Sequence, residues 1–87
     1  MRKIEWTTAF KRDFKKITTL ESAFIEALYK LANDEALAER FCDHALTGEW
    51  KDFRDCHIRP DLILIYRKPN ADILQLIRLG SHSELGL

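Results

Sequence analysis

Leu62-Ile63-Leu64-Ile65-Tyr66 decides the fold of this 87-residue chain, because five apolar residues follow one another with no polar residue between them. A strand with one solvent-exposed face alternates apolar and polar residues, so an unbroken apolar run of this length indicates a strand that is buried on both faces. Turn residues bound the run on each side, at 59–61 and at 69–72. We therefore predict a central strand over residues 62–68.

The segments beyond these two turns predict two further strands, over residues 50–58 and 73–79. Short turns join antiparallel neighbours, so the three strands are expected to form an antiparallel meander. Gly80 ends the last strand, and residues 81–87 are expected to form a short C-terminal tail.

The N-terminal half predicts one strand over residues 2–6 and two helices. Thr7 or Thr8 can cap a helix that begins near Ala9, and a second helix should start after Thr19, with Glu21 in its first turn. A further helical turn is expected within residues 36–41. The expected apolar positions are Phe10, Phe14 and Ile17 in the first helix and Leu20, Phe24, Ala27, Leu28 and Leu31 in the second. This order predicts an α+β fold in which the helices pack on a mostly antiparallel sheet.

The length of the chain predicts one domain over residues 1–87. No apolar run reaches the length of a signal peptide or of a membrane span. Cys42 and Cys56 are too few for a secreted disulfide scaffold. We therefore expect a cytoplasmic protein without a membrane partner.

Charge is unevenly distributed along the chain, although 14 Lys and Arg residues balance 14 Asp and Glu residues. Residues 1–20 carry six basic and two acidic side chains, and residues 21–50 carry two basic and seven acidic ones. Such a pattern permits a polyanion to bind on one face, because contacts with phosphates are local. An ordinary solvated surface gives the same pattern, so the charge alone decides nothing.

Three histidines, His44, His57 and His82, each lie at or near the boundary of a predicted element. Asp61 follows His57 across a tight turn, so these two side chains can be neighbours. A carboxylate beside an imidazole holds it in one tautomer and keeps it basic. The pattern indicates a shared cleft with acid–base capacity.

Cleavage of RNA needs little beyond such a set, because the 2′-hydroxyl of the substrate is itself the nucleophile. A base removes the 2′-hydroxyl proton, an acid protonates the departing 5′-oxygen, and a cation offsets the charge that grows on the phosphate. Arg54, Arg78 and Lys51 are the candidates for the cationic role, with arginine favoured for its forked donors. No metal or cofactor is required by this scheme.

Roles outside catalysis stay open for these residues. A histidine at an element boundary is commonly a surface or capping residue, and the aromatic residues Trp50 and Tyr66 fit core packing better than base stacking. Cys42, His44, Cys56 and His57 are metal-ligand types, but their spacing matches no standard tetrahedral zinc site.

Residues 43–66 contain the pattern D-H-x-L-x-G-x-W followed by R-D-x-H-x-x-P-D-x-I-L-I-Y, and residues 78–82 read R-x-G-x-H. In these motifs the chain resembles the YafQ branch of the RelE toxin superfamily. The matching segments span about a third of the chain, and the N-terminal half matches in its layout.

The resemblance implies the RelE-like fold and the toxin of a type II toxin–antitoxin pair, acting as a ribosome-dependent endonuclease of messenger RNA. It also implies a cognate antitoxin of the DinJ kind as the partner. His44, His57, Asp61 and His82 coincide with positions associated with cleavage in that branch. It favours His82 as the leading acid–base residue, His57 and His44 as groups that complete proton transfer or bind the phosphate, and Asp61 as a group that orients an imidazole.

The resemblance leaves two alternatives open, a toxin of the same fold that inhibits a protein such as DNA gyrase, as ParE relatives do, and a non-catalytic binding module. The chain also departs from the pattern of the branch at one point. An aromatic residue usually follows the position of Leu85 in the branch, whereas this chain has Gly86-Leu87.

Overall fold

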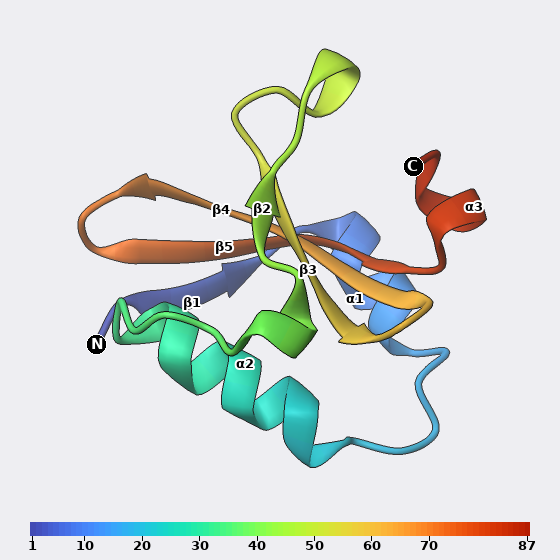
Figure 1. Ribbon diagram of the computed structural model, residues 1–87, viewed down its shortest axis with the longest axis horizontal. Coiled ribbons are helices and arrows are strands. Elements are labelled where there is room, and N and C mark those ends of the chain that lie inside the picture. The colour runs from blue at the N-terminus through green and yellow to red at the C-terminus, as the bar shows by residue number, and fades with distance from the viewer.

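The computed structural model describes residues 1–87 and contains one five-stranded sheet. The strands are Lys3–Trp6 (β1), His44–Ala45 (β2), Arg54–Arg59 (β3), Leu62–Asn70 (β4) and Ile73–Gly80 (β5). Their spatial order is β1-β5-β4-β3-β2, so β4, which begins with the apolar run, is the central strand (Figure 1). β1 pairs in parallel with β5, and all other neighbours are antiparallel. The predicted meander and the α+β class are confirmed.

Three α-helices accompany the sheet, Thr8–Phe14 (α1), Ser22–Ala32 (α2) and His82–Leu85 (α3), together with short 3₁₀ segments at Glu39–Phe41 and Gly48–Trp50. Thr7 caps α1, as expected, because its hydroxyl accepts a hydrogen bond from the amide of Phe10. The longest helix has 11 residues. No helix has the length and apolar character that crossing a membrane requires.

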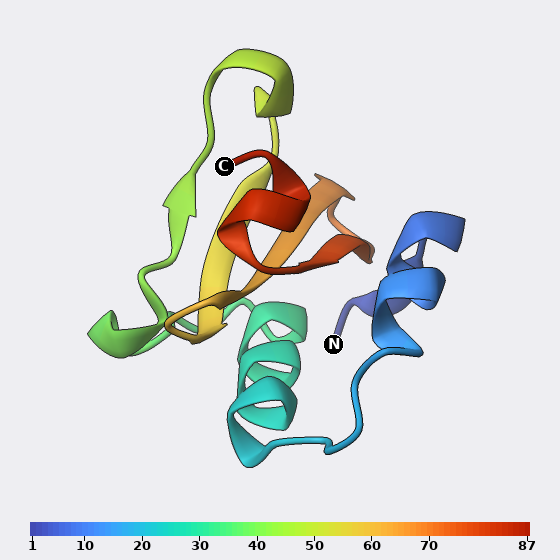
Figure 2. The ribbon, with the colours of Figure 1, turned by 90° about the vertical axis from the view of Figure 1, so that its right-hand side faces the viewer.

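Successive residues of β4 point to opposite faces of the sheet, which explains its unbroken apolar sequence. Leu62, Leu64 and Tyr66 belong to the larger core cluster, together with residues of α1 and α2. Ile63 and Ile65 belong to a smaller cluster on the other face, where Leu85 of α3 covers them. In Figure 2, α2 lies below the sheet and α3 above it. Helices therefore cover both faces of the central strand.

The boundaries of α1 and α2 differ from those that the sequence pattern predicts. α2 starts at Ser22 with Glu21 as its N-cap residue, so Glu21 does not lie in the first turn. Leu20, expected on the apolar face, precedes the helix and is 56% exposed. α1 ends at Phe14, and Ile17 packs against the core from the following loop. The reason is that tertiary packing outweighs the spacing of apolar residues in such short helices.

Two further differences concern the second half of the chain. Trp50 lies in a 3₁₀ segment, and the predicted strand begins only at Arg54, after Asp52 takes a positive φ of 75°. Residues 82–85 form a helix instead of a tail. Ser81 and Glu84 make a reciprocal capping box at its start, and this signal is readable in the sequence.

Candidate active site

The pairing of the strands brings two of the predicted histidines to the same face of the sheet. Asp55 and His57 lie two residues apart on β3, and they pair with Ile65 and Ile63 of β4. Residues at this spacing share a face, and so do residues directly opposite one another. His44 on β2 lies opposite Asp55. His44, Asp55 and His57 therefore stand on the face that α3 covers in part.

The third histidine reaches this face through the C-terminal helix. His82 is the first residue of α3, which the Ser81–Glu84 capping box starts immediately after β5. Leu85 anchors the helix by packing against Ile63 and Ile65. A hydrophobic contact and a helix cap thus place His82 beside residues that are distant in the sequence.

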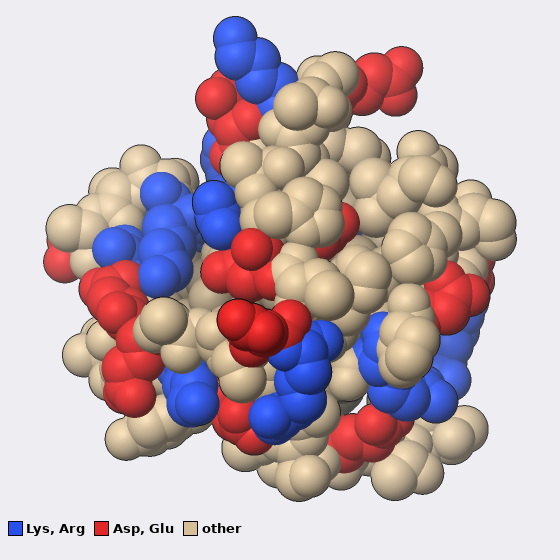
Figure 3. All heavy atoms as spheres, viewed as in Figure 1, with Lys and Arg blue, Asp and Glu red and all other residues tan.

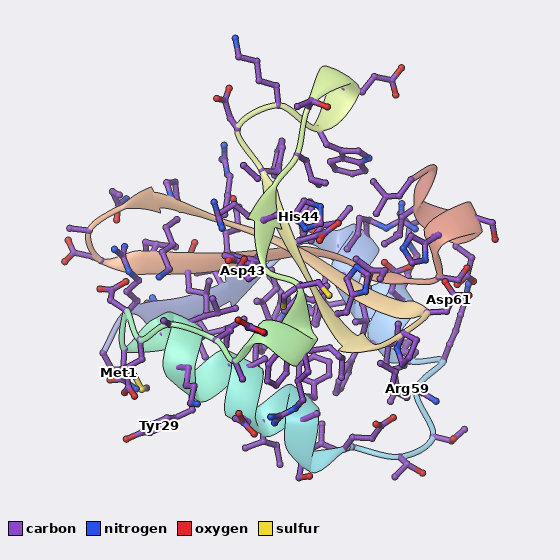
Figure 4. The ribbon with its side chains drawn as sticks, viewed as in Figure 1. Met1, Tyr29, Asp43, His44, Arg59 and Asp61 are labelled. Carbon is purple, nitrogen blue, oxygen red and sulfur yellow. The ribbon has the colours of Figure 1, made fainter.

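The three imidazoles form a row that continues to an aspartate. The ring centroids of His44 and His57 are 6.5 Å apart, and those of His57 and His82 are 5.3 Å apart. Nδ1 of His82 lies 2.7 Å from Oδ1 of Asp61, in the turn between β3 and β4. His44 and Asp61 mark the two ends of the row (Figure 4). The convergence of all four predicted residues is thus observed.

The hydrogen bonds of two imidazoles decide which nitrogen carries the proton. Nδ1 of His44 lies 2.7 Å from the carbonyl oxygen of Cys42, which can only accept, so Nδ1–H is the donor. An ionised Asp61 likewise only accepts, so Nδ1–H of His82 donates to it. In the neutral ring, Nε2 of each of these two histidines is then free to accept a proton.

Asp61 forms its hydrogen bonds with His82 and not with His57, although its sequence position predicted His57 as a neighbour. The backbone amide of His82 donates to the same oxygen, Oδ1, at 2.9 Å. This amide and the His82 side chain hold the pKa of Asp61 below its ordinary value. Asp61 is therefore ionised at neutral pH, and it accepts hydrogen bonds from both the backbone amide and the ring of His82.

The row borders a cavity of about 470 Å³ that contains no lysine or arginine. Its walls comprise His44, Leu46, Thr47, Glu49, Trp50, Asp55, His57, His82, Gly86 and Leu87. On the face of the molecule that Figure 3 shows, Lys and Arg alternate with Asp and Glu and form no continuous basic surface. Positive charge in the cavity can therefore come only from protonated imidazoles.

Arg54, one of the predicted cationic residues, points away from the histidines. It pairs with Tyr66, a member of the larger core cluster, so it stands on the opposite face of β3 from Asp55 and His57. Its Nε donates to the Tyr66 hydroxyl at 3.3 Å, and its Nη2 lies 3.4 Å from Oδ1 of Asp43. The period of two residues in a strand carries this information in the sequence itself.

Arg78 and Lys51 are also outside the row. Arg78 makes a bidentate ion pair with Asp13 of α1, with Nε to Oδ2 at 2.7 Å and Nη2 to Oδ1 at 3.2 Å. Lys51 is exposed in the loop that follows the 3₁₀ segment and does not line the cavity. The structure therefore brings together the predicted acid–base residues but not the predicted cations.

Asp55 is the site residue that sequence reasoning missed. It is 3% exposed, and its Oδ1 lies 3.2 Å from Nδ1 of His44. It lies two positions before His57 on β3, a spacing that in a strand predicts one shared face. That spacing was the available signal, and only the pairing with β2 links Asp55 to His44.

No group of three or more His, Cys, Asp and Glu side chains is arranged to hold a metal ion. Cys56 is buried in the core, and burial raises the pKa of its thiol, so the thiol stays protonated. Cys42 is exposed, and it lies in a different cavity from the one that His44 and His82 line.

Comparison with known proteins identifies the family of the chain. The family described as the bacterial toxin of type II toxin–antitoxin system, YafQ, matches residues 2–86. The chain belongs to the YafQ toxin family. A YafQ relative from Escherichia coli K12, named an mRNA interferase toxin, is 32% identical over 88 residues, which cover 97% of this chain and 95% of the relative.

Solved structures of YafQ-like toxins share the fold. A copper-bound mutant toxin from Helicobacter pylori superposes with a TM-score of 0.91 and 44% identity, over 98% of this chain and 99% of that one. YafQ in the E. coli DinJ–YafQ toxin–antitoxin complex superposes with a TM-score of 0.82 and 33% identity, over 97% and 96% of the two chains. The RelE-like fold expected from the resemblance is thereby confirmed.

Proposed function

We propose that this YafQ-family chain cleaves messenger RNA on the ribosome by histidine acid–base catalysis that needs no metal. The observation that carries the proposal is the row of three imidazoles, with ring centroids 5.3 and 6.5 Å apart, beside one cavity. The name of the E. coli relative, an mRNA interferase, supports messenger RNA as the substrate.

The reaction is a transesterification within the RNA. The 2′-oxygen forms a bond to phosphorus, and the bond from phosphorus to the 5′-oxygen breaks. One imidazole takes the 2′-hydroxyl proton and another gives a proton to the 5′-oxygen, which leaves a 2′,3′-cyclic phosphate and a 5′-hydroxyl. Positioned acid–base groups contribute about 10²–10⁴-fold to such a rate.

His82 is the leading acid–base residue in this proposal. Asp61 orients its ring through Nδ1 and leaves Nε2 to exchange the proton. His57, whose ring lies beside that of His82, is the second proton-transfer group. Because no lysine or arginine lines the cavity, protonated His44 offsets the negative charge of the phosphate.

Ribosome dependence is tested by mapping the 5′ ends of transcripts after brief expression of the protein, with and without active translation. We expect new ends within translated reading frames only, and none when initiation is blocked. With purified components, we expect cleavage to persist in EDTA and to stop when the nucleotide on the 5′ side of the cut carries 2′-deoxyribose. Cuts in untranslated RNA would refute the ribosome requirement, and intact RNA with inhibited gyrase would favour the ParE-like alternative.

We also propose that an antitoxin of the DinJ kind binds the chain in the groove between α1 and α2. The groove measures about 920 Å³ and is mainly apolar. On a monomeric protein, exposed apolar side chains are usually scattered singly. Here six of them line one groove: Met1, Trp6, Phe14, Leu20, Ile25 and Tyr29. A helix that lays an apolar face into such a groove is a common form of recognition.

The charges beside the groove define the partner further. Lys11 and Arg12 of α1 and Lys15, directly after its last residue, line the groove, and no acidic side chain does. An amphipathic helix with an acidic polar face complements this surface, and a basic one does not. The groove lies on the face of the sheet that α1 and α2 cover, and the histidines lie on the other face, beside α3.

Calorimetric titration with the antitoxin encoded beside this protein tests the groove. We expect Ile25→Asp to weaken binding about 10–100-fold, because a buried apolar anchor is lost and a charge is introduced. Lys15→Glu should weaken it and make it less sensitive to salt, whereas Lys3→Glu, on β1 and outside the groove, is the matched control. Unchanged affinity in both groove variants would rule out this surface.

A further inference from the structure

Asp55 differs from the other buried charged residue of the chain in having no fixed donor. Asp13 and Asp55 are the two buried charged side chains. Asp13 accepts hydrogen bonds from Arg78 and from the amide of Leu79. Oδ1 of Asp55 is shielded from solvent and accepts none. A buried carboxylate without donors opposes folding, so stability does not account for Asp55.

The titratable groups that act on Asp55 come from β2, β3, α3 and the segment before β2, while β4 places the apolar Ile65 opposite it. They are His44 on β2, His57 on the same strand, His82 on α3, and Asp43 just before β2. Burial raises the pKa of Asp55, and the three imidazoles act in the opposite direction. The positive charges available to Asp55 are therefore those of the histidines.

The contact with His44 has a defined geometry. Oδ1 of Asp55 lies 3.2 Å from Nδ1 of His44, the same nitrogen that donates to the carbonyl of Cys42 at 2.7 Å. The Nδ1–H of His44 is directed at the Cys42 carbonyl, so Asp55 acts on the ring as a nearby charge, and Nε2 is left for the substrate. At this distance the Asp55 carboxylate can form an ion pair with a charged imidazole.

We propose that Asp55 is a positioning residue that keeps His44 as the imidazolium which meets the RNA phosphate. This inference rests on the proposed function and supplies what the cavity lacks, a cation held in place. Glu49 and Asp55 line the cavity, and no arginine or lysine does. His44 carries the positive charge in the absence of a basic side chain, and Asp55 lies beneath it, away from solvent.

The test is Asp55→Asn, which keeps the shape of the side chain and removes its charge. On translating ribosomes with excess toxin, we expect single-turnover cleavage at pH 7.5 to slow about 10–100-fold, the usual effect of losing such a supporting carboxylate. The loss should shrink toward pH 6, where solvent protons charge His44 without help. Asp52→Asn removes one exposed carboxylate outside the cavity and should cleave at the wild-type rate.

Two measurements without RNA separate this inference from the proposed function. The pH at which the ring ¹⁵N signals of His44 change should move lower in Asp55→Asn. Circular dichroism at pH 7.5 should show that Asp55→Asn stays folded. Unchanged His44 signals in the folded variant, or equal losses of cleavage at all pH values, would each overturn the role of Asp55. A wild-type protein that leaves RNA intact on ribosomes would instead overturn the proposed function.

Discussion

Replacing His82 with glutamine is expected to slow RNA cleavage by about 10²–10⁴-fold, the range that one positioned acid–base group contributes. Glutamine can form hydrogen bonds, but it cannot accept and release a proton near neutral pH. His82 is the imidazole whose ring nitrogen and backbone amide are both held by Asp61. Its loss removes the group whose orientation is defined most completely.

The fold is expected to survive this substitution. The His82 side chain is 45% exposed, and the bond from its backbone amide to Asp61 does not depend on the side chain. The free energy of unfolding should therefore change by no more than about 0.5 kcal/mol. Circular dichroism and urea unfolding check the fold, and single-turnover cleavage on ribosomes checks the rate.

Two variants define the comparison for His82. Ser83→Ala changes the next exposed residue of α3 and should cleave normally. Asp61→Asn should lose about 10–100-fold, less than His82→Gln, because an orienting group acts through the ring it holds. Expression of folded His82→Gln should no longer arrest growth. Arrest as strong as that of the wild type would contradict the assigned role.

Asp13→Asn is expected to lower the free energy of unfolding by about 2–3 kcal/mol, the size of a lost charged hydrogen-bond pair. β1 pairs with β5 only as far as Leu76, and beyond that point α1 lies against the uncovered edge of β5. Asp13 accepts from the amide of Leu79 at 2.9 Å and from Arg78. It thereby replaces the missing strand partner.

The stabilisation by Asp13 depends on pH with a definite sign. Burial raises its pKa, but Arg78 and the Leu79 amide outweigh burial and hold the pKa below the ordinary value of 3.8. A carboxyl whose pKa is depressed in the folded state stabilises the fold above the unfolded value, and the effect is lost as pH falls through the folded value. The gap between wild type and Asp13→Asn should close below about pH 4.

Urea unfolding between pH 2.5 and pH 7 measures this difference. Asp72→Asn, an exposed aspartate in the turn between β4 and β5, is the matched control and should change stability little at any pH. Arg78→Gln should resemble Asp13→Asn in stability and leave the intrinsic cleavage rate of the folded fraction intact. A folded Arg78→Gln protein that no longer cuts RNA would instead indicate that Arg78 binds the phosphate.

Local sequence alone determined the central strand, the antiparallel meander and the family of this protein. The apolar run at residues 62–66 predicted a central strand, since only a strand buried on both faces can lack polar residues. Turn residues at 59–61 and 69–72 predicted the meander, because such residues fix the local backbone whatever surrounds them. The motifs around the histidines identified the family, which the comparison confirmed.

Part of what was missed was still written in the sequence. The period of two residues along β3 places Asp55 with His57 and turns Arg54 to the other face. Ser81 and Glu84 have the spacing of a capping box, which predicts α3 where a tail was expected. These are local rules, and applying them strand by strand recovers both features.

Only the tertiary structure decided which charged groups meet. Arg78 and Asp13 are 65 residues apart, and His82 and Asp61 are 21 residues apart. Partners at such separations are selected by strand order and by the packing of α1 and α3, which local propensity does not encode. The packing of α3 made Asp61 the partner of His82. The packing of α1 paired Arg78 with Asp13, outside the cavity. The charged groups near Asp55 are therefore three imidazoles and the carboxylate of Asp43.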